Sequence, residues 1–201
     1  MGPGRTHRYD IERTLLRTVR KLVEIVMPWL LLGAFVSAQG QAVAVIHAFA
    51  EGLAGVRAAS SDLRLSVGRD AGAPNETVLI VDYPAPTGNP AGRDVQCDAQ
   101  ATDWSGGRAI AFRIKSAQPS RVSVSFIDRH RVVYTAWTDL KGGDWEQVRI
   151  SFDTVRPNPY FQPPDATTGA SIDVSDVKFI AFAPQDKAAG RLMIDRFVLA
   201  K

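Results

Sequence analysis

The chain has 201 residues, 45% of them hydrophobic, and carries a formal net charge of +3 at pH 7. This length suits one globular domain with an appendage, and the apolar content is enough for an ordinary core. Much of the positive excess lies in the first 21 residues and the remainder is near neutral, which argues against a nucleic-acid-binding surface.

Residues 1–24 predict a basic amphipathic helix. In the stretch YDIERTLLRTVRKLV, apolar residues recur at helical intervals with basic residues among them; the apolar ones are Ile11, Leu15, Val19 and Leu22, and the basic ones are Arg13, Arg17, Arg20 and Lys21. A helix of this kind can lie at an anionic membrane surface. The membrane is therefore the first partner that the sequence indicates.

An apolar run without a full charge follows at residues 25–50, and it exceeds the roughly 20 residues that a membrane-spanning helix requires. We expect it to anchor the protein, because a charged segment as long as residues 1–24 is unusual ahead of a signal-peptide core. The alternative is a secretory signal with residues 25–36 as its core and a cleavage site after Ala38 or Ala42. Both interpretations leave the N-terminus in the cytoplasm and place the following residues on the periplasmic or extracytoplasmic side.

Residues 51–61 are rich in small residues without strand alternation and predict a linker. Over residues 62–201, short period-two runs dominate, as in RVSVSFID, where Val122, Val124 and Phe126 share one face. The other predicted strands lie in LRLSV, TVLIVDY, RAIAFRIK, RVVYTAWTDL, WEQVRISF, VKFIAFAP and RLMIDRFVLA. Many short strands joined by polar turns are typical of an all-β jelly-roll β-sandwich.

Motifs for catalysis or cofactor binding are missing from the sequence. It has no phosphate-binding loop, dinucleotide fingerprint, zinc-protease motif or nucleophile elbow. Cys97 is the only cysteine, which excludes an intrachain disulfide and a cysteine-based zinc site, and we expect it to be a small packing residue. No run of oxygen ligands marks a calcium site. We therefore expect neither an enzyme nor a bound cofactor or metal ion.

Five segments follow one another in an order that resembles a known fold: ATDWSGGRAIAFRIKS, VSVSFIDRHRVVYTAW, GGDWEQVRISFDTV, DVSDVKFIAFAP and GRLMIDRFVLA. Together with Trp104, Trp145 and the MID at 193–195, they resemble the galactose-binding-like jelly roll of family-eleven carbohydrate-binding modules over about residues 62–201. They are also similar to the complex I intermediate-associated proteins, assembly proteins that share this fold. The first resemblance implies glycan binding, and the second implies assembly of a membrane complex.

Candidate binding residues lie on one predicted strand and in two loops. Tyr134 and Trp137 are three residues apart on that strand and point to opposite faces, so if Tyr134 faces inward, Trp137 faces outward, where it stacks on a partner or is covered by a loop. That proline-rich loop, RPNPYFQPPDATTGASID, holds Tyr160 and Phe161, either as a lid over the core or as a contact patch. Arg129 lies in a charged turn. The candidates are Trp137, Tyr160, Phe161, Tyr134 and Arg129.

Two functions follow. The first is a non-catalytic, membrane-anchored binding domain that acts as an accessory, structural or assembly subunit of a respiratory or photosynthetic membrane complex, with protein partners. The alternative is a secreted or tethered carbohydrate-binding module, which would hold a glycan by aromatic stacking and by hydrogen bonds from Arg and Asp side chains. Neither involves nucleic acid.

Overall fold

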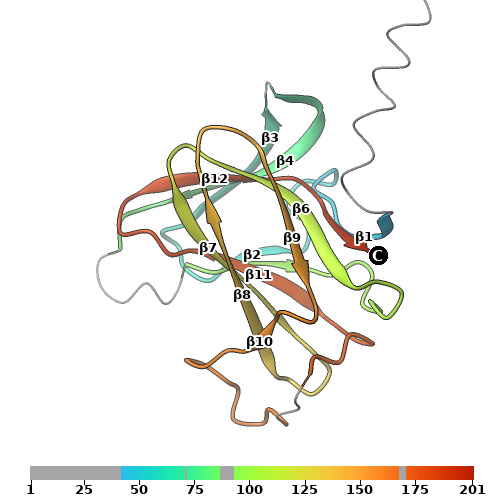
Figure 1. The fold of residues 1–201 in the computed structure, drawn as a ribbon. Coiled ribbons are helices and arrows are strands. Elements are labelled where there is room, and N and C mark those ends of the chain that lie inside the picture. The colour runs from blue at the N-terminus through green and yellow to red at the C-terminus, as the bar shows by residue number, and fades with distance from the viewer. Residues whose placement is uncertain (1–41, 71, 87–92, 168–170) are drawn as a thin grey trace, which may run out of the picture. The chain divides into compact units, whose positions relative to one another are not determined.

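The computed structural model describes residues 42–70, 72–86, 93–167 and 171–201 (Figure 1). The predicted basic helix at 1–24 and the apolar run up to residue 41 lie outside the described residues. Within the described ranges, no helix is long and apolar enough to cross a membrane. These ranges consist of strands, turns and irregular segments, which confirms the predicted all-β class for them.

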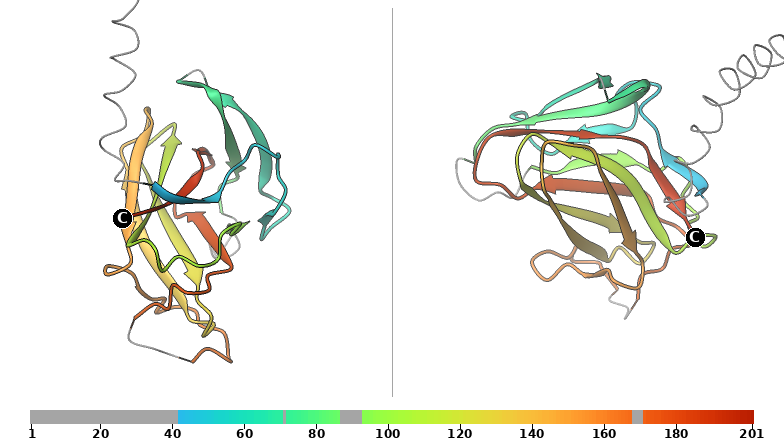
Figure 2. Two further views of the ribbon diagram at one scale, coloured as in Figure 1. Left: turned by 90° about the vertical axis from the view of Figure 1, so that its right-hand side faces the viewer. Right: turned by 45° about the horizontal axis from the view of Figure 1, so that its top comes forward.

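Two antiparallel sheets make up the described residues. In sheet A the strands run in the order β1 (Ala42–His47), β13 (Phe197–Ala200), β6 (Ala109–Ser116), β12 (Gly190–Ile194), β4 (Ala73–Tyr83) and β3 (Arg64–Asp70), and β9 (Glu146–Ser151) also pairs with β6. In sheet B the order is β10 (Arg156–Pro157), β8 (Val133–Leu140), β7 (Ser120–Ile127), β11 (Phe179–Pro184), β5 (Val95–Asp98) and β2 (Val56–Ala58). Many neighbours come from distant parts of the chain, as where β1 lies beside β13 (Figure 2).

The core lies between the sheets and is built from their inward-facing residues. Val122, Val124 and Phe126 of β7 are fully buried, as the alternation predicted. Trp104 is fully buried too, and its ring lies 5.9 Å from the Phe126 ring and 6.0 Å from the Phe152 ring, with which it stacks. Aromatic clusters of this kind bury large apolar areas. Trp104 therefore has a structural role.

Trp145 and Asp195 take part in polar contacts on sheet A. The Trp145 indole donates from Nε1 to Asp70 Oδ2 over 2.7 Å, and the Arg113 guanidinium carbon lies 5.4 Å from the Trp145 ring centroid. This indole hydrogen bond is the largest of the causes that hold the pKa of Asp70 below its usual value. Asp195 accepts a hydrogen bond from Arg113 Nε over 2.9 Å. The Trp145 contact links the segment before β9 to the end of β3, and the Asp195 contact links the turn between β12 and β13 to β6.

Cys97 lies on β5, between β11 and β2. Its side chain is 1% exposed, and burial raises the pKa of the thiol to about 12. A buried thiol with a raised pKa is a poor nucleophile, because the thiolate is the reactive form. The predicted packing role of Cys97 is therefore confirmed.

The sandwich begins earlier in the chain than the sequence predicted. Residues 42–47 form β1, an edge strand of sheet A that pairs with β13, and β2 lies inside the predicted linker. Ile46 is 0% exposed and Phe49 1% exposed, so both belong to the core. The predicted end of the apolar segment at residue 50, the linker at 51–61 and the start of the sandwich at residue 62 were therefore wrong.

The physical reason for this error lies in the composition of β1. A short apolar run forms either a buried strand or part of a helix, and its periodicity does not distinguish them. Because the β1 segment AVAVIH continues an apolar run upstream, the whole of 25–50 resembled one span. With β1 assigned to sheet A, residues 25–41 remain of the predicted span, which is close to the lower limit of about 17 residues for a spanning helix.

Candidate functional site

The outward face of sheet B carries the candidate site. The register of β7 against β8 places Trp137 opposite Ser123 and Thr135 opposite Ser125. Trp137 is 41% exposed, whereas Tyr134 is 1% exposed and lies in the core. The predicted opposite orientation of these two aromatics is confirmed, and it removes Tyr134 from any surface that a ligand could reach.

A groove of about 580 Å³ lies on this face and is lined by Arg121, Trp137, Tyr160 and Gln185, which we call the groove residues. Arg121 belongs to β7 and Trp137 to β8, Tyr160 lies in the loop after β10, and Gln185 directly follows β11. Figure 1 shows β8, β7 and β11 in the same sheet, with the loop after β10 at its end. Sheet pairing thus collects four side chains from four separate segments into one groove.

The aromatic part of the groove consists of Trp137 and Tyr160. Tyr160 is 87% exposed and its neighbour Phe161 is 61% exposed, so the proline-rich loop presents both rings to solvent instead of packing them on the core. Phe161 is not one of the groove residues. The contact-patch interpretation of this loop therefore fits the structure better than the lid interpretation.

The polar part of the groove consists of Arg121 and Gln185. The Gln185 backbone donates to the Arg121 carbonyl oxygen over 2.8 Å, and its Nε2 lies 3.0 Å from Ser123 Oγ. Because the amide nitrogen is engaged, the Gln185 amide oxygen is left to accept a hydrogen bond from a ligand. Arg121 pairs with Asp139 at 3.5 Å, and both side chains are well exposed, so this ion pair is weak and Arg121 can donate to a ligand instead.

Asp186, the residue after Gln185, is held in place by several hydrogen bonds. Its Oδ2 accepts hydrogen bonds from Tyr83 Oη over 2.8 Å and from Ser120 Oγ over 2.6 Å. Arg93, which is 6% exposed, donates to the Asp186 carbonyl oxygen over 2.8 Å. Burial, with a smaller contribution from Asp186, raises the pKa of Tyr83, so the phenol stays a protonated donor. These contacts hold the segment that carries Gln185.

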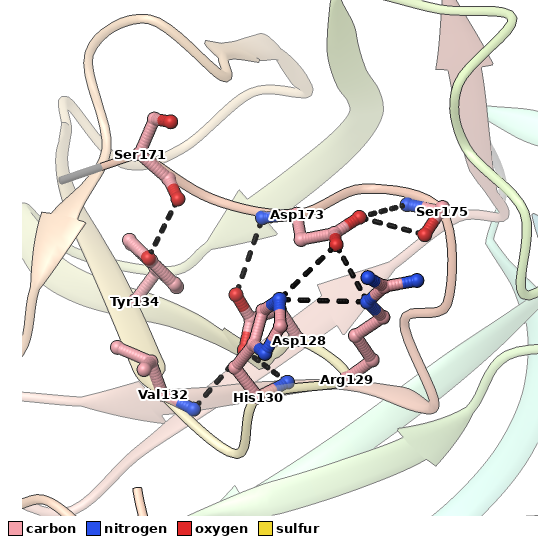
Figure 3. Close-up of polar contacts among 8 residues, drawn as sticks. All are labelled: Asp128, Arg129, His130, Val132, Tyr134, Ser171, Asp173 and Ser175. Carbon is pink, nitrogen blue, oxygen red and sulfur yellow. Dashed lines mark hydrogen bonds and ion pairs between the residues drawn. The ribbon is translucent and has the colours of Figure 1, made fainter. Parts of the chain in front are cut away.

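Arg129 lies outside the groove, in a network that joins two loops (Figure 3). Its Nε is 2.7 Å from Asp173 Oδ2, and His130 Nε2 is 3.3 Å from the same oxygen. Hydrogen bonds from Ser175 are the main cause that lowers the pKa of Asp173, so this carboxylate is ionised at neutral pH. Arg129 is therefore occupied with holding the loops together.

The buried side chains of Asp128 and Tyr134 connect the hairpin to the loop that carries Asp173 (Figure 3). Asp128 is 3% exposed and accepts from the backbone of Val132 over 3.1 Å and of Asp173 over 3.2 Å. The Tyr134 hydroxyl donates to the Ser171 carbonyl oxygen over 3.0 Å. Of the five predicted binding residues, the structure thus brings together Trp137 and Tyr160.

Arg121 and Gln185 were not predicted as site residues. The alternation of RVSVSFID does place Arg121 on the outward face with Ser123 and Ser125. Gln185 has no such signal, because it follows the end of a strand and reaches the groove only through the pairing of β11 with β7.

Comparisons with known proteins identify the fold. No protein-family model and no curated protein matches the chain. Among solved structures, a family 11 carbohydrate-binding module from Clostridium thermocellum, in complex with a β-1,3-1,4-mixed-linked tetrasaccharide, is 18% identical with a TM-score of 0.61, covering 78% of this chain and 94% of that one. The solution structure of CtCBM11 is 19% identical with a TM-score of 0.62, covering 82% of this chain and 97% of that one.

Two more distant neighbours extend this result. A family 30 carbohydrate-binding module is 14% identical with a TM-score of 0.51, covering 81% of this chain and 96% of that one. An exo-β-agarase is 13% identical with a TM-score of 0.55, covering 79% of this chain but 26% of that one. At such identities these likenesses show the fold. The chain shares the jelly-roll fold of family 11 carbohydrate-binding modules, which confirms the resemblance seen in the sequence.

Proposed function

We propose that residues 42–201 form a non-catalytic carbohydrate-binding domain that holds a glycan in the groove on sheet B. The observation that carries this proposal is the joint exposure of Trp137 and Tyr160 in one groove. The C–H face of a sugar ring is apolar and packs on an aromatic ring, whereas its hydroxyl groups need hydrogen-bonding partners. The groove residues supply both kinds of contact.

The polar groups fit a neutral glycan. Arg121 has only donors, and Gln185 offers its amide oxygen as an acceptor, so together they match a hydroxyl group that accepts and one that donates. Two carboxylates lie beside this polar end: Asp139 is 3.5 Å from Arg121 Nε, and Asp186 Oδ1 accepts from the Arg121 backbone N–H over 3.4 Å. A strongly anionic polysaccharide would therefore gain little at this end of the groove.

The same groove is poorly equipped for hydrolysis. Glycosidases flank the scissile bond with two carboxyl groups, one as acid and one as base or nucleophile. None of the four groove residues carries a carboxyl group. Binding without cleavage is therefore the function that these side chains support.

The fold comparisons support this function better than a role in membrane-complex assembly. The family 11 and family 30 neighbours are named as carbohydrate-binding modules, and one of them is recorded with a bound mixed-linked tetrasaccharide. Because that ligand is an oligosaccharide, we favour an oligomeric glycan over a single terminal sugar.

The direct test is a binding measurement on the purified protein. We expect calorimetric titration to detect binding to a β-1,3-1,4-mixed-linked tetrasaccharide or to agaro-oligosaccharides, with a change in tryptophan fluorescence as Trp137 is covered. Neither probe should be cleaved during the titration. A folded protein that binds no member of a wider panel of neutral polysaccharides would contradict the proposal.

The position of β1 distinguishes between the two predicted signal-peptide cleavage sites. Cleavage after Ala38 leaves β1 complete, whereas cleavage after Ala42 removes its first residue, which pairs with Ala200. We expect the exported protein to begin at Gln39, as read by N-terminal sequencing of material from the periplasm or medium. A membrane-bound protein that begins at Met1 would instead support the uncleaved anchor. In that case, too, we expect the domain on the periplasmic or extracytoplasmic side.

A further inference from the structure

The loop that presents Tyr160 holds its shape without a helix or a long strand. It runs from Asn158 to Gln162, directly after the two-residue strand β10. Tyr160 and Phe161 at its tip are 87% and 61% exposed, so burial of these rings does not fix the loop. Something else must hold the backbone, and the two amide side chains at the loop ends do so.

Asn158 fixes the first half of the loop. Its backbone donates to the Val133 carbonyl oxygen over 2.7 Å, and its Nδ2 donates to Thr135 Oγ1 over 3.0 Å. Its Oδ1 accepts from the backbone N–H of Tyr160 over 2.8 Å and of Phe161 over 3.2 Å. One side chain thus ties the tip of the loop to β8.

Gln162 fixes the second half. Its Oε1 accepts from the Val133 N–H over 2.9 Å, and its Nε2 donates to the Val133 carbonyl oxygen over 2.9 Å. The amide therefore pairs with one residue of β8 much as a neighbouring strand would. The same Nε2 donates to the Asn158 carbonyl oxygen over 3.0 Å, which closes the loop on itself.

The anchor points lie on the strand that also carries Trp137. Thr135 and Trp137 are two residues apart on β8 and share its outward face, which separates them by about 7 Å along the strand. Tyr160 is thereby positioned from the same strand as Trp137. Ordering a loop or a long side chain on binding opposes association, and a loop that is already ordered avoids this loss.

From this geometry we infer that Asn158 and Gln162 are positioning residues, which hold Tyr160 at a set distance from Trp137 before any glycan arrives. This inference rests on the proposed function. It adds that affinity depends on two side chains that do not line the groove. It also answers why two large aromatics lie in a proline-rich loop: the loop is a rigid support for Tyr160.

The test compares four variants of the full chain by titration with the mixed-linked tetrasaccharide and with agaro-oligosaccharides. Tyr160→Ala removes the ring, Asn158→Ala removes its support, and Asn158→Asp keeps an oxygen that accepts from the Tyr160 and Phe161 amides. Thr167→Ala, an exposed change further along the same loop, is the matched control. We expect Asn158→Ala to weaken binding by about three- to tenfold, and Asn158→Asp to stay within about twofold of the natural protein.

Amide hydrogen exchange of the free protein separates positioning from general stability. The Tyr160 and Phe161 amides should exchange slowly in the natural protein and in Asn158→Asp, and fast in Asn158→Ala, while the amides of β7 and β11 keep their protection. Fast exchange of Tyr160 in the natural protein would overturn the inference. The inference would also be overturned if Asn158→Ala bound the glycan as tightly as the natural protein while Tyr160→Ala had lost affinity. If Tyr160→Ala binds as well as the natural protein, the proposed use of the groove fails instead.

Discussion

Replacing Trp137 with alanine should weaken glycan binding by at least about thirtyfold, the loss expected when a central aromatic anchor is truncated. Trp137 is 41% exposed, and it shares the groove with Tyr160, Arg121 and Gln185. A sugar ring on the indole would cover its exposed apolar face. Since the side chain is not part of the core, the variant should unfold at nearly the temperature of the natural protein. Titration calorimetry and thermal denaturation measure the two effects.

Trp145→Ala is the matched control for this variant. Trp145 is a half-buried tryptophan whose contacts, Asp70 and Arg113, belong to sheet A. Its loss should leave the affinity unchanged. Equal losses of affinity in both variants would point to a general disturbance of the fold, and an unchanged affinity in Trp137→Ala would exclude the groove on sheet B as the glycan site.

Phe49→Ala should lower the free energy of unfolding by about 3–5 kcal/mol, as is usual when a large aromatic is removed from a packed core. The Phe49 side chain is 1% exposed, and its ring centroid lies 6.4 Å from that of Phe197 and 5.1 Å from that of His47. Little nearby can refill the space, because these neighbours are held on paired strands. Chemical denaturation followed by circular dichroism gives the value.

Leu53→Ala provides the comparison from the same stretch of chain. Leu53 is 38% exposed, and surface substitutions of this kind usually change the free energy of unfolding by less than about 0.5 kcal/mol. If Phe49→Ala were as mild as Leu53→Ala, residues 42–49 would not belong to the core. The interpretation of that segment as part of a membrane-spanning helix would then be favoured again.

Strands such as β7 could be predicted because their two faces differ in polarity. In β7, Val122, Val124 and Phe126 face the core, and Ser123 and Ser125 face outward. The β1 strand lacks this contrast. Val45 is 44% exposed while Ile46 is buried, so an apolar residue occupies the outward position where a polar one would have signalled a strand.

The site was predictable in part for a similar reason. Parity along one strand separates Trp137 from Tyr134, and the prolines mark the loop of Tyr160 as irregular. The assembly of the groove is not local, because it depends on which strands pair and in which register. The place of Gln185 in the groove therefore could not be predicted from the sequence. Neither could the ion pair between Arg129 and Asp173.

The pairing of Gln162 with Val133 has a consequence for solubility. β10 covers β8 only opposite Tyr134 and Thr135, and a bare sheet margin can recruit a strand from another molecule. By occupying both backbone groups of Val133, Gln162 shields part of that margin. The loop that displays Tyr160 to a ligand thus also opposes self-association through this sheet edge. Changes to the loop that alter which glycan is bound should therefore be tolerated only where Gln162 still pairs with Val133.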